Sequence, residues 1–395
     1  MSFLILATIL LIVYWIVEYT KHLRNVKKVP IRIHVNGTRG KSSVTRLIAA
    51  GLRAGGIRAV AKTTGTLPRF IHTDGTESAI VRLMGANIIE QKYIFRNAVA
   101  MKAEAIVIEC MAVNPIYQWV AERRLIKATV GVLTNARLDH TDLMGETVPE
   151  IAMSLSNFFP PKKVCYTAED VDTIYKVLKD RSVKFGTDLQ QILPTNVTKE
   201  ELLGFSYIEH PDNVQLALKV CEHHGIKRDV ALKGMQKASP DPGALTQHRV
   251  LENDKIMMFY NVFAANDPAS TDFLYRRISD NITRGTKFII LNSRSDRFFR
   301  TDQLLEVCSK LEFDYLLLTG ESPQKAYEHA LDLKIPKNKV IKVGQPLVRE
   351  VYEKILALTD KEAHIVGIGN IAGEIKYGAQ IVAHFKHLEH NQKNN

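Results

Sequence analysis

Residues 36–43 (NGTRGKSS) have the residue types and spacing of a phosphate-binding loop. Before them, Ile31, Ile33 and Val35 alternate with polar residues, which is the periodicity of a strand. After them, apolar residues recur at helical spacing until residues 55–56, a Gly-Gly pair that predicts the end of a helix. A glycine loop between a strand and a helix is the context that nucleotide phosphates require.

Each polar residue of this loop has a plausible task in binding ATP. Backbone N–H groups and the positive end of the following helix would face the phosphates. Lys41 would bring a mobile cation to the β- and γ-phosphates, and Ser42 would offer a hydroxyl to Mg²⁺. The general pattern places a glycine where this chain has Val35, and Gly37 takes its place. The residues predicted to bind the nucleotide here are Asn36, Gly37, Thr38, Arg39, Gly40, Lys41, Ser42 and Ser43.

Three further polar clusters follow apolar runs that read as buried strands. The runs are 57–61, 105–108 and 129–133, and with a helical stretch at 88–101 they predict a parallel sheet covered on both faces. Ligands bind at the carboxyl ends of such strands. The clusters are Lys62-Thr63-Thr64-Gly65-Thr66, then Glu109, then Thr134-Asn135 with Asp139-His140-Thr141-Asp142.

Taken singly, Glu109 could cap a helix and His140 could be an ordinary surface histidine. Their joint placement beside the phosphate loop favours metal ligation, because a carboxylate and an imidazole can hold Mg²⁺ on ATP. We therefore predict Ser42, Thr64, Glu109 and His140 as metal ligands, and Lys41, Glu109 and His140 as catalytic residues.

The N-terminus predicts a membrane anchor. Residues 3–17 (FLILATILLIVYWIV) carry no charge, although the run is slightly shorter than the roughly 20 residues that span a bilayer. No basic start or small-residue cleavage site marks a cleaved signal peptide. Lys21, Arg24, Lys27 and Lys28 follow the run and predict that the next domain is cytoplasmic. The alternative is a buried or interfacial apolar helix.

Composition narrows the partners. The net charge of +11 fits an anionic membrane surface, a polyanionic ligand or a plain solvated surface. No zinc finger, aromatic RNA motif or long basic stripe supports nucleic acid binding. The four cysteines are far apart in sequence, which indicates neither a zinc site nor a disulfide framework and fits a reducing compartment.

A second α/β domain is expected from residue 245 onward. Strand candidates at 288–291, 315–318, 340–343 and 365–368 alternate with helical stretches. Residues 292–297 (NSRSDR) directly follow the first of these strands, which is a good position for groups aimed into a cleft, so Arg294 and Arg297 either face a ligand there or are solvated surface arginines.

The residues described so far resemble those of the Mur ligase superfamily of ATP-dependent amide ligases. Its loop has the form GT-x-GK-S/T, which residues 37–42 match and which accounts for the position of Gly37. The resemblance implies that Glu109, after a strand, is a metal ligand, that His140, in the TN…DH-x-D segment, is the ligand of a second metal, and that Asn213 contacts the nucleotide base.

A closer resemblance, over essentially the whole chain, is to the ligase subunits of poly-γ-glutamate (capsule) synthases. It rests on the phrases KTTGT (62–66), ECMAVNP (109–115), DPGA (241–244), FAAND (263–267) and GIGNI (367–371), and on the N-terminal anchor. It implies a γ-glutamyl ligase that uses ATP and Mg²⁺ and acts through an acyl phosphate on glutamate and a growing poly-γ-glutamate chain. The second domain would close over the nucleotide, small membrane subunits would accompany the chain, and a homo-oligomer is possible.

The chain also departs from the cell-wall Mur ligases. Ser154 stands where those enzymes often carry a carbamylated lysine, and their Gly-Arg pair is Gly243-Ala244 here. The nucleotide contact of their C-terminal domain would fall on Asn261, Asn266 or Asp267, and the resemblance leaves the choice among these three open.

The expected organisation is an α/β protein with an anchor helix (1–20), a basic linker (21–29), a P-loop parallel-sheet ATPase domain (30–244) and a smaller Rossmann-like domain (245–395). Alternative functions are another Mur-type ligase such as a folylpolyglutamate synthase, a P-loop ATPase or kinase of a membrane complex, and a non-catalytic scaffold.

Overall fold

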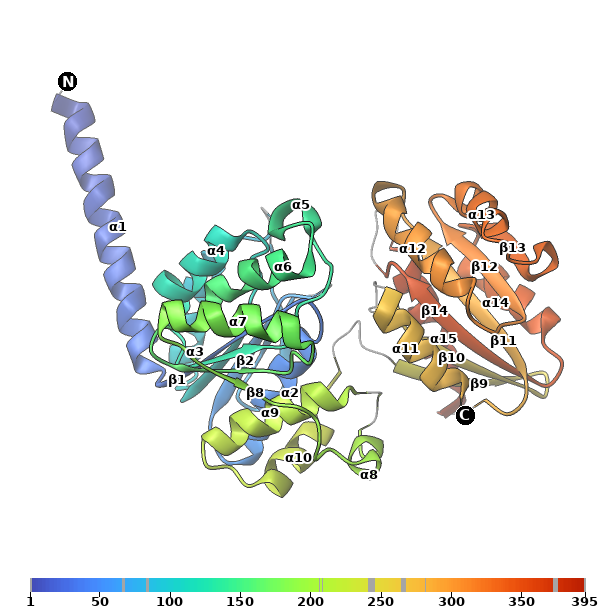
Figure 1. Ribbon diagram of the computed structural model, residues 1–395, viewed down its shortest axis with the longest axis horizontal. Coiled ribbons are helices and arrows are strands. Elements are labelled where there is room, and N and C mark those ends of the chain that lie inside the picture. The colour runs from blue at the N-terminus through green and yellow to red at the C-terminus, as the bar shows by residue number, and fades with distance from the viewer. Residues whose placement is uncertain are drawn as a thin grey trace. The chain divides into compact units, whose positions relative to one another are not determined.

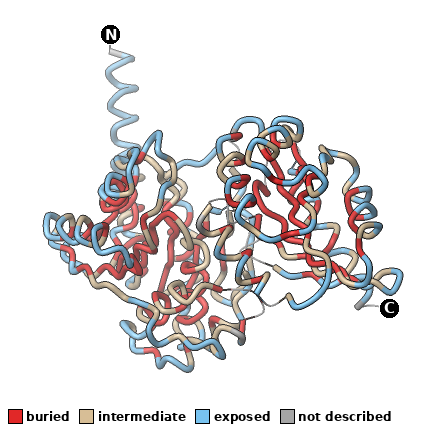
Figure 2. The backbone as a smooth tube through the Cα atoms, turned by 45° about the vertical axis from the view of Figure 1, so that its right-hand side comes forward, coloured by how far each residue is buried: buried red, intermediate tan, exposed pale blue. Residues whose placement is uncertain are grey.

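The computed structural model describes residues 2–65, 68–82, 85–205, 207, 209–240, 246–263, 268–280, 282–371 and 376–393. The chain divides into two compact units, Met1–Asp241 and Pro242–Asn395, here called unit 1 and unit 2 (Figure 1). Each has its own central sheet and its own hydrophobic core, as the red segments in Figure 2 show. Each unit is therefore described by itself.

The sheet of unit 1 has eight strands in the order β4-β3-β2-β5-β1-β6-β7-β8. In this order, all neighbours in the series β2, β5, β1, β6, β7 and β8 pair in parallel. At the other edge of the sheet, β3 pairs antiparallel with β2 and β4 pairs antiparallel with β3. The expected parallel sheet is thus present, with an antiparallel edge that the sequence reading did not include. The strands are β1 Ile31–Asn36, β2 Ala59–Thr63, β3 Arg69–Ile71, β4 Glu77–Ala79, β5 Ala105–Glu109, β6 Val130–Leu133, β7 Val164–Thr167 and β8 Asp188–Gln191.

Helices cover both faces of this sheet, which explains the near-continuous apolar strands. In β5, Val107 faces a core shared with α2, α9 and α10, while Ile106 and Ile108 face the opposite core with α3 and the π-helix η1. The helices are α2 Lys41–Ala54, α3 Glu90–Ala100, α4 Pro115–Val120, η1 Ala121–Ile126, α5 Thr141–Met144, α6 Val148–Leu155, η2 Ser156–Phe158, α7 Asp172–Phe185, α8 Lys199–Leu203, α9 Pro211–His223 and α10 Arg228–Gln236.

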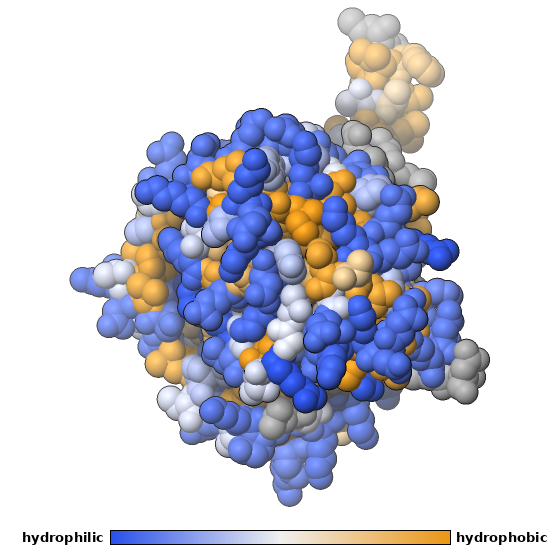
Figure 3. Space-filling model, turned by 90° about the vertical axis from the view of Figure 1, so that its right-hand side faces the viewer, coloured by the Kyte–Doolittle hydropathy of each residue, from blue (hydrophilic) through white to orange (hydrophobic). Residues whose placement is uncertain are grey.

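The N-terminal helix α1 spans Ser2–Lys28 and therefore includes most of the segment expected to be a basic linker. It is about 40 Å long at 1.5 Å per residue. Its large apolar side chains from Phe3 to Val17 are 48–83% exposed, whereas His22, Val26 and the following Val29 are buried against unit 1. The projecting part of α1 is exposed in Figure 2 and mainly hydrophobic in Figure 3. By length and composition α1 can cross a membrane, which is weak evidence taken alone.

The sheet of unit 2 has six strands in the order β13-β12-β11-β14-β10-β9. All pair in parallel except β9, which forms an antiparallel hairpin with β10. One face packs on α14 and α15, where Phe259 stacks on Phe385. The elements are β9 Thr246–Glu252, β10 Lys255–Asn261, α11 Pro268–Ser279, β11 Thr286–Ser293, η3 Ser295–Arg297, α12 Phe298–Cys308, β12 Tyr315–Gly320, α13 Pro323–Asp332, η4 Lys337–Lys339, β13 Val340–Gly344, α14 Val348–Leu358, β14 Glu362–Gly369 and α15 Tyr377–Lys393.

Candidate active site

The loop between β1 and α2 depends on two glycines. Gly37 has φ 132° and Gly40 has φ 81°, a region that L side chains rarely adopt. Space is also lacking, because a Cβ on Gly37 would lie 2.1 Å from Thr134 Oγ1 and one on Gly40 would lie 2.4 Å from Asn213 Oδ1. The loop is thus packed between the end of β6 and the start of α9, with no room for a side chain at either glycine.

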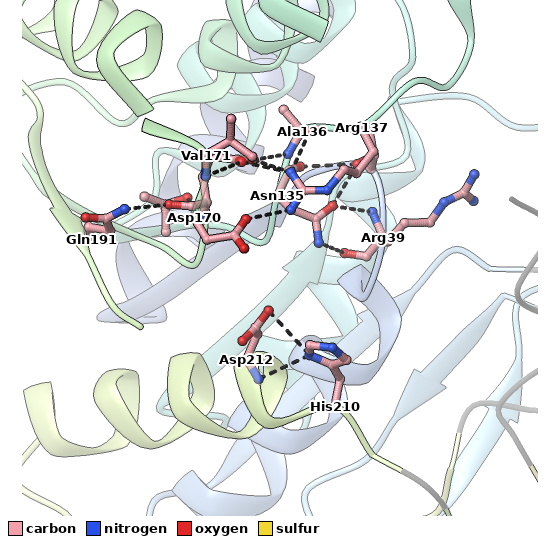
Figure 4. A network of polar contacts seen from close by, with 12 residues as sticks. Arg39, Asn135, Ala136, Arg137, Asp170, Val171, Gln191, His210 and Asp212 are labelled. Carbon is pink, nitrogen blue, oxygen red and sulfur yellow. Dashed lines mark hydrogen bonds and ion pairs between the residues drawn. The ribbon is translucent and has the colours of Figure 1, made fainter. Parts of the chain in front are cut away.

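Asn135, which follows β6, holds the first half of this loop in place. Its Oδ1 accepts hydrogen bonds from Thr38 Oγ1 (2.7 Å) and from the Arg39 backbone N–H (3.1 Å), and its carbonyl accepts from the Thr38 N–H (3.0 Å). Figure 4 shows the Asn135 amide turned toward Arg39. These bonds join the loop after β1 to the end of the neighbouring strand β6. A segment distant in the sequence therefore holds the loop in place.

The segment after Asn135 is itself ordered by a buried carboxylate. Glu169, which is fully buried, accepts from the Ala136 N–H (2.7 Å) and from the Arg137 guanidinium (2.8 Å), and Arg137 also binds Asp170 (Figure 4). Because the Ala136 backbone is fixed in this way, the neighbouring Asn135 is held in register with the loop.

Lys41 begins α2 and lies over the loop. Its Nζ donates to the carbonyls of Gly37 (2.7 Å) and Thr38 (3.1 Å). Burial lowers the pKa of Lys41, and the nearby Glu109 carboxylate partly offsets that effect. The ammonium therefore lies where the loop backbone converges, in the position expected of a group that meets a phosphate.

Ser42, Thr64 and Glu109 meet at the ends of three elements. Glu109 is almost fully buried at the end of β5, and its Oε2 accepts from Ser42 Oγ (2.8 Å) and from the Thr64 N–H (2.7 Å). Neighbouring oxygen ligands of an octahedral Mg²⁺ lie about 3 Å apart when each bond is about 2.1 Å. The Ser42 and Glu109 oxygens therefore have the separation needed to bind one Mg²⁺ together.

His140 lies in the segment that follows Asn135, at the start of α5. It has φ 46°, its N–H donates to Asp139 Oδ1 (3.1 Å), and Asp139 pairs with Arg39 of the loop at 3.6 Å. Within the described part of the chain, no group of three or more His, Cys, Asp or Glu side chains could hold a metal alone.

Asn36 and Asn213, both predicted to bind the nucleotide, make hydrogen bonds beside the loop. Asn36 is buried at the end of β1, and its Nδ2 donates to Gln118 Oε1 (2.9 Å) beneath the loop. Asn213 lies in the first turn of α9, where its Nδ2 donates to the buried Glu209 (2.8 Å) and its Oδ1 touches Gly40. Burial raises the pKa of Glu209, while its contacts with Asn213 and Ser43 lower it. Neither Gln118 nor Glu209 carries a motif that sequence reasoning could have used.

A buried ion pair behind β2 also escaped the sequence reading. Lys62 is fully buried, with its Nζ 2.6 Å from Glu90 Oε1 and 3.3 Å from Met111 Sδ, and Glu90 receives a bidentate contact from Arg82. Lys62 lies two residues before Thr64, whose N–H contacts Glu109. The Lys62–Glu90 ion pair therefore links the end of β2 to helix α3.

In unit 2 the candidate residues lie near the carboxyl ends of β10 and β11. Asn261 is fully buried, and its side-chain oxygen accepts a hydrogen bond from the Phe263 N–H. Arg294 makes a bidentate contact with Asp296. Asn292, which was not singled out, donates to the carbonyl of Asn370 (2.6 Å). Thr66, residues 241–245, Asn266 and Asp267 lie outside the described residues, as does the side chain of Arg297.

Ser154 occupies a position in α6 that is 6% exposed, and its Oγ has no partner within the described residues. A short hydroxyl there cannot reach as far as a carbamylated lysine. Any second metal would therefore need different ligands from those of the cell-wall enzymes.

A glycine loop braced by Asn135, with a lysine, a serine and a buried glutamate at adjoining strand ends, has the arrangement of a nucleotide-phosphate site. The family model "Mur ligase middle domain" matches residues 35–235, about half the chain, and "Poly-gamma-glutamate synthase CapB C-terminal domain" matches residues 247–388. The chain is 37% identical over 387 residues to "PGA synthase CapB" of Bacillus subtilis, with 94% of this chain and 95% of that protein covered. It is 35% identical over 376 residues to "Capsule biosynthesis protein CapB" of Bacillus anthracis, covering 93% and 80% of the two chains.

The chain therefore belongs to the CapB family of poly-γ-glutamate synthases, which are ATP-dependent amide ligases. Among solved structures it resembles the ADP complex of Mycobacterium tuberculosis folylpolyglutamate synthase, with a TM-score of 0.67, 16% identity, and 93% and 94% of the chains covered. At that identity the likeness concerns the fold alone, so it does not favour the folylpolyglutamate alternative.

Proposed function

We propose that this chain joins glutamate residues through γ-amide bonds and does so at the inner surface of a membrane, with ATP as the energy source. The observation that carries the proposal is the convergence of Lys41, Ser42 and Glu109 at one strand edge. Solved relatives of the same fold are described as complexes with ADP, AMPPNP and Mn ion, which supports a nucleotide and a divalent cation at this edge.

Amide formation from a carboxylate needs activation, because a carboxylate oxygen is a poor leaving group. In the proposed reaction, an oxygen of the γ-carboxylate attacks the γ-phosphorus of ATP, and ADP leaves. The α-ammonium of a second glutamate loses one proton, and the resulting amine attacks the carbonyl carbon of the acyl phosphate. The C–O bond to phosphate breaks, inorganic phosphate leaves, and the nitrogen gives a second proton to solvent. Both reactants of the first step are anions, so the protein must position them and neutralise charge.

The chain's own residues divide this work. Lys41 places a cation over the loop, and the backbone held by Asn135 presents N–H groups to the phosphates. Ser42 and Glu109, with Thr64 and His140 as further candidates, would hold a Mg²⁺, which would supply positive charge to the phosphates. Asn213 would contact the base, and Asn261, Asn266, Asp267, Arg294 or Arg297 would contact the nucleotide from unit 2.

Hydroxylamine trapping tests the chemistry. The full chain is incubated with ATP, Mg²⁺ and glutamate or oligoglutamate, and hydroxylamine should capture the acyl phosphate as a γ-hydroxamate. The Lys41→Ala variant should give none, while keeping its melting temperature. Absence of hydroxamate with every glutamate substrate would rule out the acyl phosphate, and ADP release unaffected by glutamate would favour an ATPase or kinase.

The anchoring part is tested separately. Apolar side chains from Phe3 to Val17 are exposed, and Lys21, Arg24, Lys27 and Lys28 follow them, which supports a cytoplasmic catalytic part. The full chain should stay in the membrane fraction after a high-salt wash, whereas a chain that begins at Glu18 should be soluble. Small membrane subunits and a homo-oligomer also belong to the proposal, and co-purification of the full chain from its own cells would test them.

A further inference from the structure

A cavity of about 570 Å³ lies between α1 and α3, away from the phosphate loop. The residues that α1 contributes are Tyr14, Glu18, Lys21, His22 and Asn25, which recur at i, i+4, i+7, i+8 and i+11 and so share one face. Those from α3 and its approach include Ile89, Lys92, Tyr93 and Arg96, which also share a face. The cavity is thus a groove between two facing helix surfaces.

The helix that forms one wall is fixed to the domain. Tyr19 donates to the carbonyl of Arg124, His22 contacts the carbonyl of Leu125 at 2.9 Å, and the His22 ring packs edge-on against Phe95. Lys92 of α3 pairs with Glu18 of α1 at 2.5 Å. The groove therefore keeps its shape, because both of its walls belong to unit 1.

Two of the cationic side chains that line the groove have no carboxylate partner among the described residues. Lys92 is compensated by Glu18, and Glu90 is compensated by Lys62 and Arg82. Burial lowers the pKa of His22, so that ring is neutral near pH 7. Lys21 and Arg96 are exposed and, among the described residues, have no carboxylate partner, although the Arg96 guanidinium lies over the Tyr93 ring at 5.1 Å.

With the uncharged run in the hydrocarbon core, Lys21 falls at the depth of the lipid headgroups, and Arg96 lines the same groove. The uncharged run ends at Val17, and Lys21 is four residues further, about 6 Å along the helix. The polar layer on each side of the hydrocarbon core is about 5–8 Å thick. Tyr14 lines the mouth of the groove, at the level where aromatic side chains gather at membrane interfaces.

We propose that this groove binds the phosphate of one anionic phospholipid, with Lys21 and Arg96 as its ligands and the acyl chains lying along the exposed apolar face of α1. A lipid suits both features, since the cations need an anion and the apolar side chains need hydrocarbon. A transmembrane helix of another protein would cover the apolar face of α1 but would bring no anion to Lys21 and Arg96. The inference rests on the proposed anchoring and is independent of the ligase chemistry.

The full chain is reconstituted in phosphatidylcholine nanodiscs that contain a small fraction of spin-labelled phosphatidylglycerol or, in parallel, spin-labelled phosphatidylcholine. The motionally restricted fraction of each label gives the relative association of the two lipids. Phosphatidylglycerol should be preferred, and Lys21→Gln/Arg96→Gln should lower the preference roughly tenfold or more, since each cation near an anionic headgroup is worth about 1 kcal/mol, or about fivefold.

The matched control is Lys27→Gln/Lys28→Gln, which removes two charges from the same helix outside the groove and should change the preference by less than about twofold. Salt at 0.5 M should weaken a diffuse attraction more than a held headgroup. Equal loss in both double variants, release by 20 mM inorganic phosphate, or no preference in the parent chain would each overturn the lipid site. Failure to enter neutral nanodiscs would instead overturn the anchoring.

Discussion

Ser42 Oγ and Glu109 Oε2 are 2.8 Å apart, although 67 residues separate them in the chain. Ser42 is the second residue of α2, the helix after the phosphate loop, and Glu109 ends the neighbouring strand β5. The β1–β5 pairing in register Val35↔Glu109 brings them together. The distance suits two ligands of one Mg²⁺.

Replacing Glu109 by Gln should lower glutamate-dependent ADP release about 100-fold or more, because the amide is a poor Mg²⁺ ligand and charge on the phosphates is less well neutralised. The rate is measured against Mg²⁺ concentration at saturating ATP. Glu104→Gln, at the residue directly before β5 whose carboxylate pairs with the exposed Arg58, should leave the rate within twofold. Equal rates for parent and Glu109→Gln would remove Glu109 from the metal site.

Gly40→Ala should abolish ATP binding measured by calorimetry, since the new Cβ would lie 2.4 Å from Asn213 Oδ1 and the loop would have to move. Gly56→Ala is the matched control. Its φ of 85° is nearly the same as that of Gly40, but its added Cβ would have no neighbour within 4 Å. Both variants bear the backbone strain of about 1 kcal/mol, so a difference in ATP binding isolates the close approach to Asn213. Similar affinities would show that the loop adapts.

Lys62→Met should destabilise unit 1 by about 3 kcal/mol in urea unfolding, because it removes the fully buried ammonium and leaves the half-buried Glu90 with Arg82 as its remaining partner. Arg58→Gln, which removes one side of the exposed Arg58–Glu104 pair, should cost at most about 1 kcal/mol. A small effect of Lys62→Met would mean that water or Arg82 replaces the lost ammonium.

The stability of unit 1 should fall as the pH rises above neutrality, in part because of His34. Burial favours the neutral ring, but contacts with Cys110 and Glu122 outweigh it and raise the pKa of His34 to about 9. A folded-state pKa above the unfolded value of about 6.5 stabilises fully below pH 6.5, and the contribution is lost as the pH passes 9.

The contribution of His34 is at most about 3 kcal/mol. Urea unfolding between pH 6 and 10 should therefore show the parent chain and His34→Gln differing most at low pH and converging near pH 10. His72→Gln, at a half-buried position where the ring contacts Ser78 Oγ, serves as the control, and its stability curve should run parallel to that of the parent chain. If the difference in unfolding free energy between the parent chain and His34→Gln stayed constant from pH 6 to 10, a group other than His34 would cause the pH dependence.

The sequence determined the phosphate loop, because glycine, lysine and serine spacing next to a strand and a helix is a local pattern. It also determined the strands at β5 and β6, whose apolar runs are continuous, and the apolar character of α1. Family membership rested on phrases such as GIGNI, and the comparisons confirmed it. The site assignments themselves remain predictions, since nucleotide contact has not been observed.

Only the tertiary structure decided which side chains brace the site. Asn135, Glu209 and Gln118 act through contacts between segments that lie about 80 to 170 residues apart, and no periodicity reports such pairings. The antiparallel edge β3–β4 was missed because three-residue strands carry too little pattern. The continuation of α1 through its basic end was missed because packing of His22 and Val26 on unit 1, and not composition, holds that segment helical.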